Sequence, residues 1–392
     1  MTIVSIVKTN GNVEEGVRKA VELAGGIDIE PGANILIKPN LSCAKPSGSG
    51  LVTSVEVISA MVRLVKEMGG KPLVGDLPIA GWDPKETYKV TGVKKATEDA
   101  GGQFIDFSKD QPVTIQIPDA VKLKSVKLVR TALIADAIIS LPVLKAHFFT
   151  GLTLCIKNLK GLTLQDQRTK MHVLGLYDPI IDLFSALKSK VIFGLVDGTV
   201  GCESIRPSGP YYGPTEGKPI KLDTLIAGKD IVAVDSVAAV TAGIKPKSMK
   251  LLQIAYERGL GEIEDIEVRG EKIKPQKLKQ TLFGRVMGSL NSLWTSKIAN
   301  PITHPLVKRL FGPQVQSLRS VEKELQEVVP SKIVLAGKCD NCGICVKSCS
   351  IGNIKLGKNG PIIGDKCLVC LICVEACPLN ALAVKRVEEV SA

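Results

Sequence analysis

The sequence predicts an α/β fold with a mainly parallel sheet covered by helices, then a basic helical connecting segment, then a small cysteine-rich α+β module. Three observations predict it. Strand-like and helix-like runs alternate over residues 1–270, basic residues dominate much of 271–330, and eight of the eleven cysteines lie within 331–386. We therefore expect the 392-residue chain to form three domains with these boundaries.

Alternating patterns define the elements of the first region. Residues 2–8 form a strand-like run, and 13–24 carry a helical pattern. A second helical pattern, 55–68, follows Thr53-x-x-Glu56, which fits a capping box. Five apolar runs have the length and β-branched content of buried strands: Ile35–Ile37, Pro72–Gly75, Ala137–Leu141, Val191–Val196 and Thr224–Ala227. Because strands and helices alternate, we expect helices on both faces of a parallel sheet.

Polar residues directly follow several of these runs. In open α/β sheets, ligands bind beyond the carboxyl ends of the strands, so these residues are candidates for one pocket. Cationic and amide groups suit an anionic substrate, and a His or Lys can transfer a proton. We interpret as substrate-binding residues Lys38, Asn40, Asp76, Lys157, Asn158, Lys160 and Asp197, and as catalytic residues Lys145, His147 and His172. The alternative is that these Asp and Asn residues cap helices and the lysines are solvated.

The basic segment accounts for most of the chain's net charge of +12. Between Lys272 and Arg319 there are nine Lys or Arg and no Asp or Glu. Apolar residues from Leu282 to Ile298 recur at spacings of three and four, which predicts an amphipathic helix. We favour a connecting helix packed on the core; peripheral membrane contact or docking of an acidic partner through 272–319 remains open. No nucleic-acid-binding motif is present, so nucleic acid is not an expected partner.

The cysteines form two runs with identical spacing. Cys339-x2-Cys342-x2-Cys345-x3-Cys349 repeats 28 residues later as Cys367-x2-Cys370-x2-Cys373-x3-Cys377. In two-cluster ferredoxins, the last cysteine of each run ligates the other cluster. We therefore expect two [4Fe–4S] clusters, one on Cys339, Cys342, Cys345 and Cys377, the other on Cys367, Cys370, Cys373 and Cys349. A pair of zinc sites is the alternative, and the two complete runs disfavour it.

Two resemblances follow from these motifs. Residues 339–378 resemble the bacterial-type two-[4Fe–4S] ferredoxin module, with Ser350 where a proline is usual, so the third domain is expected to be a ferredoxin-like α+β module. Lys38-Pro39-Asn40-Leu41, Gly75-Asp76, Lys145-Ala-His147, Lys157-Asn158-Leu-Lys160-Gly161 and Asp230-x4-Asp235 resemble the family catalogued as domain of unknown function 362. Members of that family often carry such a ferredoxin tail. The resemblance implies this domain pairing and a shared polar site, and it implies no substrate.

The remaining features narrow location and chemistry. No secretory signal and no uncharged apolar run of about 18 residues is present, so we expect a cytoplasmic protein with reduced cysteines. Phosphate-binding and dinucleotide-binding glycine motifs are missing. The three isolated cysteines, Cys43, Cys155 and Cys202, are expected to be buried as small apolar residues, and Cys155, beside Lys157 and Lys160, is the one to test for reactivity.

The function that this sequence predicts is that of an iron–sulfur oxidoreductase. Low-potential electrons would come from a redox partner protein, a ferredoxin or similar donor, and pass through two [4Fe–4S] clusters to an anionic small-molecule substrate in the α/β domain. The alternative is a non-catalytic electron-transfer protein that relays electrons between protein partners.

Overall fold

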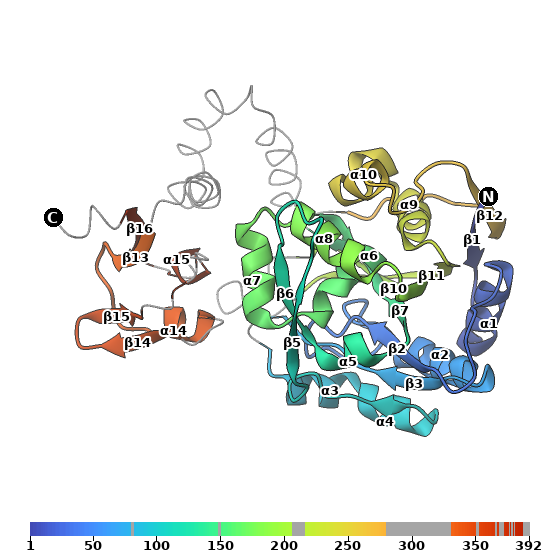
Figure 1. The fold of residues 1–392 in the computed structure, drawn as a ribbon, viewed down its shortest axis with the longest axis horizontal. Helices are drawn as coiled ribbons and strands as arrows, with labels where there is room; N and C mark the ends of the chain where they lie inside the picture. The colour runs from blue at the N-terminus through green and yellow to red at the C-terminus, as the bar shows by residue number, and fades with distance from the viewer. Residues whose placement is uncertain are drawn as a thin grey trace. The chain divides into compact units, whose positions relative to one another are not determined.

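The computed structural model describes residues 1–79, 82–147, 150–205, 216–279, 331–349, 353–364, 367, 372–375, 377, 379 and 381–386. The chain divides into two compact units (Figure 1). The first comprises residues 1–164, 177–206 and 216–285, and the second comprises residues 165–176, 207–215 and 286–392.

The first unit is built on a mixed sheet, which has ten strands in the described part of the chain. Eight of them follow the order β12-β1-β11-β10-β7-β2-β3-β4, while β8 pairs with β10 and β9. Their bounds are β1 Thr2–Val7, β2 Asn34–Pro39, β3 Lys71–Val74, β4 Gln103–Phe104, β7 Ala137–Leu141, β8 Val143–His147, β9 Gly151–Thr153, β10 Val191–Glu203, β11 Lys218–Gly228 and β12 Ile266–Gly270.

The centre of this sheet is parallel. Strand β2 pairs in parallel with β3 and β7, and β7 pairs in parallel with β10. Strand β11 runs antiparallel between β10 and β1. The α/β prediction is thus confirmed, and each of the five predicted strands is present. Strand β10 extends beyond the predicted run because it continues through a register shift between Gly198 and Val200, where glycines and polar residues interrupt the apolar pattern.

Helices cover both faces of the sheet, as predicted (Figure 1). Helices α1 Val13–Leu23, α2 Val55–Glu67 and α4 Val93–Asp99 form one layer, and α6 Cys155–Asn158, α8 Tyr177–Leu187, α9 Ile231–Thr241 and α10 Lys250–Glu257 form the other. The first layer packs on a continuous apolar core that includes Ile35 and Ile37 of β2 and Val57 of α2. This burial of one helix face against strands is the main stabilising contribution in such a layered fold.

Shorter elements complete the description. They are α3 Pro84–Thr91, β5 Pro112–Gln116, β6 Ser125–Val129, α5 Arg130–Ile134, η1 Leu159–Leu162, α7 Gln165–Val173 and η2 Pro246–Ser248. Of these, β5 and β6 form a separate antiparallel pair.

The predicted capping box at the start of α2 is wrong by one residue. Ser54, not Thr53, is the N-cap, and its side chain accepts a hydrogen bond from Val57 N. The Thr53 hydroxyl instead accepts from Asn40 N at 2.9 Å and donates to Leu141 O at 2.7 Å. Thr53 therefore joins β2 to β7 at their carboxyl ends, which a local sequence pattern does not reveal.

The α/β unit also continues past the expected boundary at residue 270. Gln276 N donates to Thr241 O, and Lys279 N donates to Glu203 Oε2 at 2.9 Å. Leu278 is buried. The start of the basic segment thus packs on the α/β unit, whereas the predicted amphipathic helix from Leu282 onward lies outside the described residues.

The C-terminal module, within the second unit, contains two antiparallel strand pairs and two short helices among its described residues. Strand β13 Ser331–Leu335 pairs with β16 Leu382–Arg386, and β14 Ile354–Gly357 forms a hairpin with β15 Gly360–Ile363. The helices are α14 Ile344–Ser348 and α15 Ile372–Glu375. A small apolar core includes Ile333, Ile354 and Leu382 together with four cysteines, Cys345, Cys349, Cys367 and Cys373.

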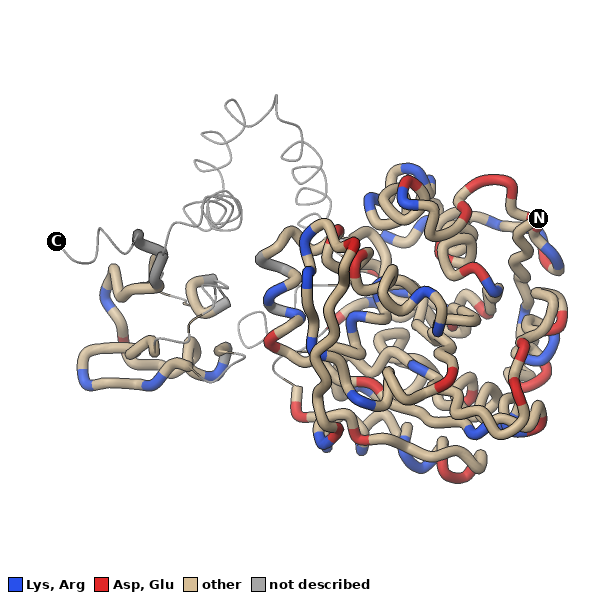
Figure 2. Tube along the Cα trace, viewed as in Figure 1, with Lys and Arg blue, Asp and Glu red and all other residues tan. Residues whose placement is uncertain are grey.

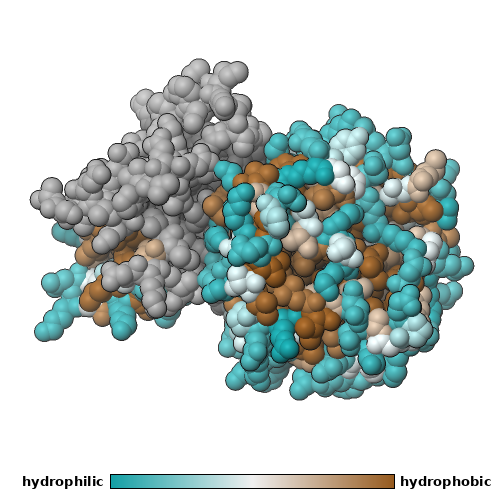
Figure 3. Space-filling model, viewed as in Figure 1, coloured by the Kyte–Doolittle hydropathy of each residue, from teal (hydrophilic) through white to brown (hydrophobic). Residues whose placement is uncertain are grey.

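Surface character differs along the chain. Residues of both charge signs occur along the described trace of the α/β unit, whereas Lys and Arg predominate along that of the C-terminal module (Figure 2). Hydrophobic and hydrophilic residues adjoin on both surfaces (Figure 3). Within the described ranges, no helix combines the length and apolar character that crossing a bilayer requires.

Candidate functional site

A buried ion pair lies where β2 and β3 end. Lys38 Nζ is 2.7 Å from Asp76 Oδ1, and both side chains are almost completely buried. Lys38 Nζ also donates to Pro39 O at 2.9 Å, and Asp76 Oδ2 accepts from Leu41 N at 2.6 Å. Two adjacent parallel strands bring these residues together, as the sequence predicts, and the charges are satisfied by each other and by the backbone.

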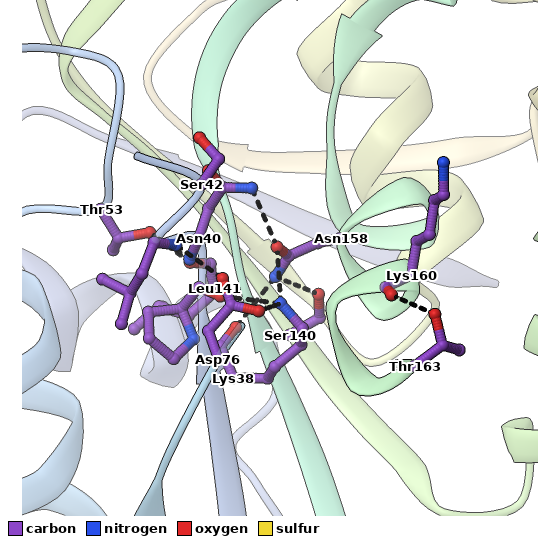
Figure 4. Close-up of polar contacts among 12 residues, drawn as sticks. Lys38, Asn40, Ser42, Thr53, Asp76, Ser140, Leu141, Asn158, Lys160 and Thr163 are labelled. Carbon is purple, nitrogen blue, oxygen red and sulfur yellow. Dashed lines mark hydrogen bonds and ion pairs between the residues drawn. The ribbon is translucent and has the colours of Figure 1, made fainter. Parts of the chain in front are cut away.

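Asn158 links this pair to Asn40 (Figure 4). Its Oδ1 accepts from Lys38 Nζ at 3.0 Å and from Asn40 Nδ2 at 3.2 Å. Its Nδ2 donates to Lys38 O at 2.9 Å and to Ser140 Oγ at 3.3 Å. Each polar atom of this buried amide therefore has a protein partner, which fixes the carboxyl ends of β2 and β7 against α6.

Lys145, on β8, extends the buried network. Its ammonium donates to Asn40 Oδ1 at 2.8 Å, Ser42 Oγ at 2.7 Å and Leu51 O at 2.6 Å. Burial lowers the pKa of this lysine, and the nearby thiols of Cys43 and Cys202 oppose that shift. A lysine that already donates to three oxygens is well suited to hold the site in shape and to add positive charge to it.

One face of the β8–β9 hairpin carries three basic side chains, Lys145, His147 and Lys157. Lys145 and His147 are two residues apart on β8, so their side chains lie on the same face of the hairpin. Lys145 lies opposite Thr153 on β9. His147 is partly exposed, and its Nδ1 accepts from Thr150 N at 3.2 Å. Lys157 Nζ reaches Thr153 Oγ1 at 3.4 Å. Lys145, His147 and Lys157 therefore gather on the same side of the hairpin.

The amine of Lys157 is the most unusual group in this set. The residue keeps some solvent exposure, while its amine lies among protein atoms. Burial, followed by the positive charge of Lys145, lowers its pKa to about 7. An ordinary lysine has a pKa of about 10.4, whereas Lys157 can change protonation near neutral pH.

Gly161 closes the network from the side of η1. A Cβ added here would lie 2.5 Å from Lys38 Nζ and would overlap the Asp76 carboxylate. The Lys160 side chain points away from Lys38 and Asn158, and its main-chain oxygen accepts from Thr163 Oγ1 at 2.8 Å (Figure 4). Glycine is therefore required by close packing at 161, while Lys160 is not part of the buried network.

Asp235, on α9, anchors the loop that carries Asn158. Its two carboxylate oxygens accept from Cys155 N at 2.7 Å and Ile156 N at 3.0 Å, at the start of α6. Burial raises the pKa of Asp235 to about 7. The Cys155 thiol is fully buried, and burial followed by the charge of Asp235 raises its pKa well above the usual range. Cys155 is thus buried, as expected, and its raised pKa disfavours the thiolate that a reactive cysteine requires.

Two predicted site residues lie elsewhere. Asp197 Oδ2 accepts from Ser54 N at 2.7 Å, and its Oδ1 accepts from Thr199 Oγ1 at 2.6 Å, so it holds the start of α2 against β10. Burial raises its pKa. His172 is on α7, which clusters with the second unit, and its side chain lies outside the described residues.

The four cysteines predicted to share a cluster line one cavity in the C-terminal module. Cys339, Cys342, Cys345 and Cys377 all contribute to its wall. Burial raises the pKa of the Cys345 thiol, and the charges of the other three raise it further. Four thiolates this close repel one another, and bound iron would offset that repulsion. The donor set therefore fits an iron–sulfur cluster.

Backbone amides point at three of the cysteine sulfurs. Asn341 N donates to Cys339 Sγ at 3.3 Å, and Ala381 N donates to Cys377 Sγ at 3.1 Å. Asn353 N donates to Cys349 Sγ at 3.2 Å. Such N–H···S bonds stabilise thiolate charge and tune the potential of a bound cluster.

The predicted second set of ligands is described in part. Cys349, Cys367 and Cys373 lie in the apolar core of the module, and Cys370 falls outside the described residues. Considering only the described residues, no group of three or more Cys, His, Asp or Glu is placed to hold a single metal ion. In a cluster, each thiolate binds a different iron, so the sulfurs are held farther apart than around one ion.

Comparison with known proteins concerns the α/β unit. The family described as "Domain of unknown function (DUF362)" matches residues 35–240, more than half of the chain. The chain belongs to this family. The DUF362 region begins in β2 and ends in α9, so it contains Lys38, Asp76, Lys145, Asn158 and Asp235. The C-terminal module lies outside the matched region.

Two individual proteins are similar. The "Thylakoid-associated protein sll1697" of Synechocystis sp. is 26% identical over 258 residues, which cover 64% of this chain and 76% of that protein. The lactate racemase apoprotein from Thermoanaerobacterium thermosaccharolyticum aligns with a TM-score of 0.39 and 18% identity over 62% of this chain. That alignment spans 58% of the racemase chain.

Sequence reasoning missed several residues of the buried polar network around Lys38, Asn158 and Lys145. Ser42 and Leu51 hold Lys145, and Ser140 holds Asn158. Gly161 and Asp235 were visible only as parts of the family motifs. A buried hydroxyl or main-chain oxygen carries no sequence signal of its own, because its importance depends on which distant residue it meets.

Proposed function

We propose that this DUF362 protein is an iron–sulfur oxidoreductase that delivers electrons to a small anionic substrate at the β8–β9 hairpin of the α/β unit. The observation that carries the redox part is the cavity lined by Cys339, Cys342, Cys345 and Cys377. A [4Fe–4S] cluster supplies one-electron transfer at low potential when bound. The second set, Cys349, Cys367, Cys370 and Cys373, would hold a second cluster.

The basic side chains at the β8–β9 hairpin, Lys145, His147 and Lys157, support an anionic substrate. Lys145 and Lys157 repel each other, and this repulsion contributes to the lowered pKa of Lys157. An anion bound between them would relieve the repulsion and make protonated Lys157 more favourable. His147 lies on the same face of the hairpin as Lys145 and is partly exposed. Its imidazole is proposed to exchange a proton with the same ligand.

The buried residues have a different part in this proposal. Lys38, Asp76 and Asn158 hold the ends of β2, β3 and α6 together. Asn40 accepts a hydrogen bond from Lys145 and so fixes that lysine to the same network. A fixed cationic group does not have to reorganise when a charged ligand arrives. These residues are therefore proposed to position the accessible groups and not to touch substrate.

Reoxidation of the reduced protein tests the enzyme proposal. The anaerobically reconstituted chain would be reduced, freed of reductant and exposed to fractions of a metabolite extract. We expect one fraction of small anions to reoxidise it, and we expect Lys157→Met to slow that reaction at least about tenfold while leaving reduction unchanged. Lys71→Met is the matched control, because Lys71 begins β3 at the opposite end of the sheet and is exposed.

The second candidate is an electron carrier without a substrate. The internal pairing of Lys38, Asp76 and Asn158 favours it, since these groups hold one another without a ligand. Reoxidation by no small-molecule fraction, together with fast reoxidation by a redox protein, would support the carrier and contradict the enzyme. Equal reoxidation rates for Lys157→Met and the parent would remove Lys157 from the reaction.

A further inference from the structure

We propose that the mouth of the four-cysteine cavity is a docking surface for an acidic redox protein. The mouth is defined here as Lys338, Leu356, Lys358 and Leu379, which are exposed residues around Cys342. The proposal rests on the proposed function, because it takes the cavity to hold a cluster that exchanges electrons with a partner.

One cysteine of the cavity lies at the surface. Cys342 is exposed, whereas Cys345 is only 7% exposed and belongs to the apolar core of the module. Electron exchange between two proteins requires their redox centres to approach closely. Among the described cysteines Cys342 is the exposed one, so the edge at Cys342 is the side that the proposal assigns to the partner protein.

Apolar side chains border this opening. Leu379, 50% exposed, lines the cavity together with Pro361. In the β14–β15 hairpin, Leu356 lies opposite Pro361, so both share the face that is turned toward the cysteines. Leu356 is 47% exposed, and its Cδ1 would be 3.3 Å from a Cβ at Gly343, in the cysteine loop. Exposed leucines at the rim of a functional cavity are typical of an interaction site.

The opposite face of the same hairpin provides an internal comparison. Lys355 lies opposite Ile362, and both alternate with the cavity-facing residues. Both are exposed, Ile362 to 62%. Lys355 and Ile362 therefore match the lysines and leucines of the mouth in chemistry, but they lie on the face of the hairpin that is turned away from the cavity.

Two exposed lysines lie next to the cysteine loop. Lys338 directly precedes the ligand Cys339, and Lys358 O accepts from Asn341 Nδ2 at 3.2 Å. The turn that carries Lys358 packs on the cysteine loop, since a Cβ at Gly360 would be 3.6 Å from Cys339 Cβ. Both lysines are exposed.

Charge selects the kind of partner. Residues 331–386 contain eight Lys or Arg and three Asp or Glu, an excess of five basic residues (Figure 2). Asp340 is the acidic residue at the opening, and Cys342 N donates to its Oδ1 at 3.0 Å, which lowers its pKa. A basic rim around a redox centre attracts a partner with an acidic surface and raises the rate of encounter.

Stopped-flow electron transfer from a reduced flavodoxin of net negative charge to the oxidised full-length protein tests the surface. At low salt we expect Lys358→Glu to lower the second-order rate constant at least about threefold, and Lys338→Glu/Lys358→Glu at least about tenfold. Lys355→Glu, which reverses the same charge on the opposite hairpin face, should change it less than about twofold. At roughly 0.5 M salt these differences should disappear. There, Leu379→Ala should still slow the reaction and Ile362→Ala should not.

Two results would overturn the surface, and they are distinguishable. Equal flavodoxin rates for Lys358→Glu and Lys355→Glu at low salt, with normal reduction of both by photoreduced 5-deazariboflavin, would overturn the docking surface alone. A reconstituted protein that neither reagent reduces would overturn the proposed function and the docking surface together.

Discussion

Lys38 and Asp76 form an ion pair of 2.7 Å between the ends of two neighbouring parallel strands, with both side chains almost completely buried. Neither charge meets solvent, so each depends on the other and on nearby backbone groups. The pair lies at the centre of the buried polar network, because Asn158 and Gly161 both pack against it.

Removal of either partner should strongly destabilise the protein. Lys38→Met or Asp76→Leu would leave an unpaired buried charge, which typically costs about 3–5 kcal/mol. The double variant should be less destabilised than the sum of the single variants, because both charges are then gone. Denaturant unfolding measures this. Lys95→Met, which breaks the exposed Lys95–Asp99 pair, is the control and should leave the free energy of unfolding nearly unchanged. Additive losses at Lys38 and Asp76 would argue against an energetically coupled pair.

Gly161→Ala should destabilise the α/β unit by about 1–3 kcal/mol. The added methyl would lie 2.5 Å from Lys38 Nζ, so the buried pair or η1 must shift. Lys160→Ala is the matched neighbour, and its partly exposed side chain points away from the pair. Thermal unfolding of both variants checks the prediction, and an unchanged melting temperature for Gly161→Ala would contradict the close packing.

Asp235 should make stability fall as pH rises toward neutrality. Its pKa is raised to about 7 in the folded protein, so the folded state holds a proton that the unfolded state releases near about pH 4. The stabilisation is complete below about pH 4 and is lost as pH rises through about 7, up to about 4 kcal/mol in total. Unfolding free energies between pH 4 and 8 should therefore slope downward more steeply for the parent than for Asp235→Asn. Parallel curves would exclude Asp235 as the source.

Lys157 should react as a neutral amine near pH 7. Its pKa of about 7 implies that roughly half of the amine is unprotonated at that pH. Labelling with a limiting amine reagent, quantified by mass spectrometry and normalised to the peptide that contains exposed Lys71, should give an inflection near pH 7 for Lys157. Lys145→Met removes the neighbouring positive charge and should move that inflection upward. An inflection for Lys157 at the same pH in Lys145→Met as in the parent would show that burial alone lowers the pKa of Lys157.

The sequence predicts the α/β layers well because their signal is local. The run Ala137–Leu141 is apolar except for Ser140 and has the bounds of β7. Lys38, Asn40 and Asp76 were placed together by a topological rule, since adjacent parallel strands end at the same edge. Asp197 obeys the same rule, yet its carboxylate holds the N-cap of α2, which only the three-dimensional path of the chain determines.

The distinction between buried and accessible lysines could not be predicted. Lys38, Lys145, Lys157 and Lys160 look alike in sequence, and the structure gives them four different surroundings. Burial depends on which distant segments cover a side chain, as Gly161 covers Lys38. The cysteine spacing, by contrast, predicts its grouping from the sequence alone, because three ligands lie on one short loop and the duplication indicates the fourth.

Iron analysis tests the assignment of the cysteines. After anaerobic reconstitution, the parent should contain about eight irons and eight acid-labile sulfides per chain. Cys377→Ser should lose the cluster at the cavity, and Cys349→Ser the other, which leaves about four irons in each. Cys43→Ser, a buried cysteine of the α/β unit, should retain about eight. A parent protein with about two metal ions, zinc among them, or with eight irons that survive Cys377→Ser, would contradict the two-cluster account.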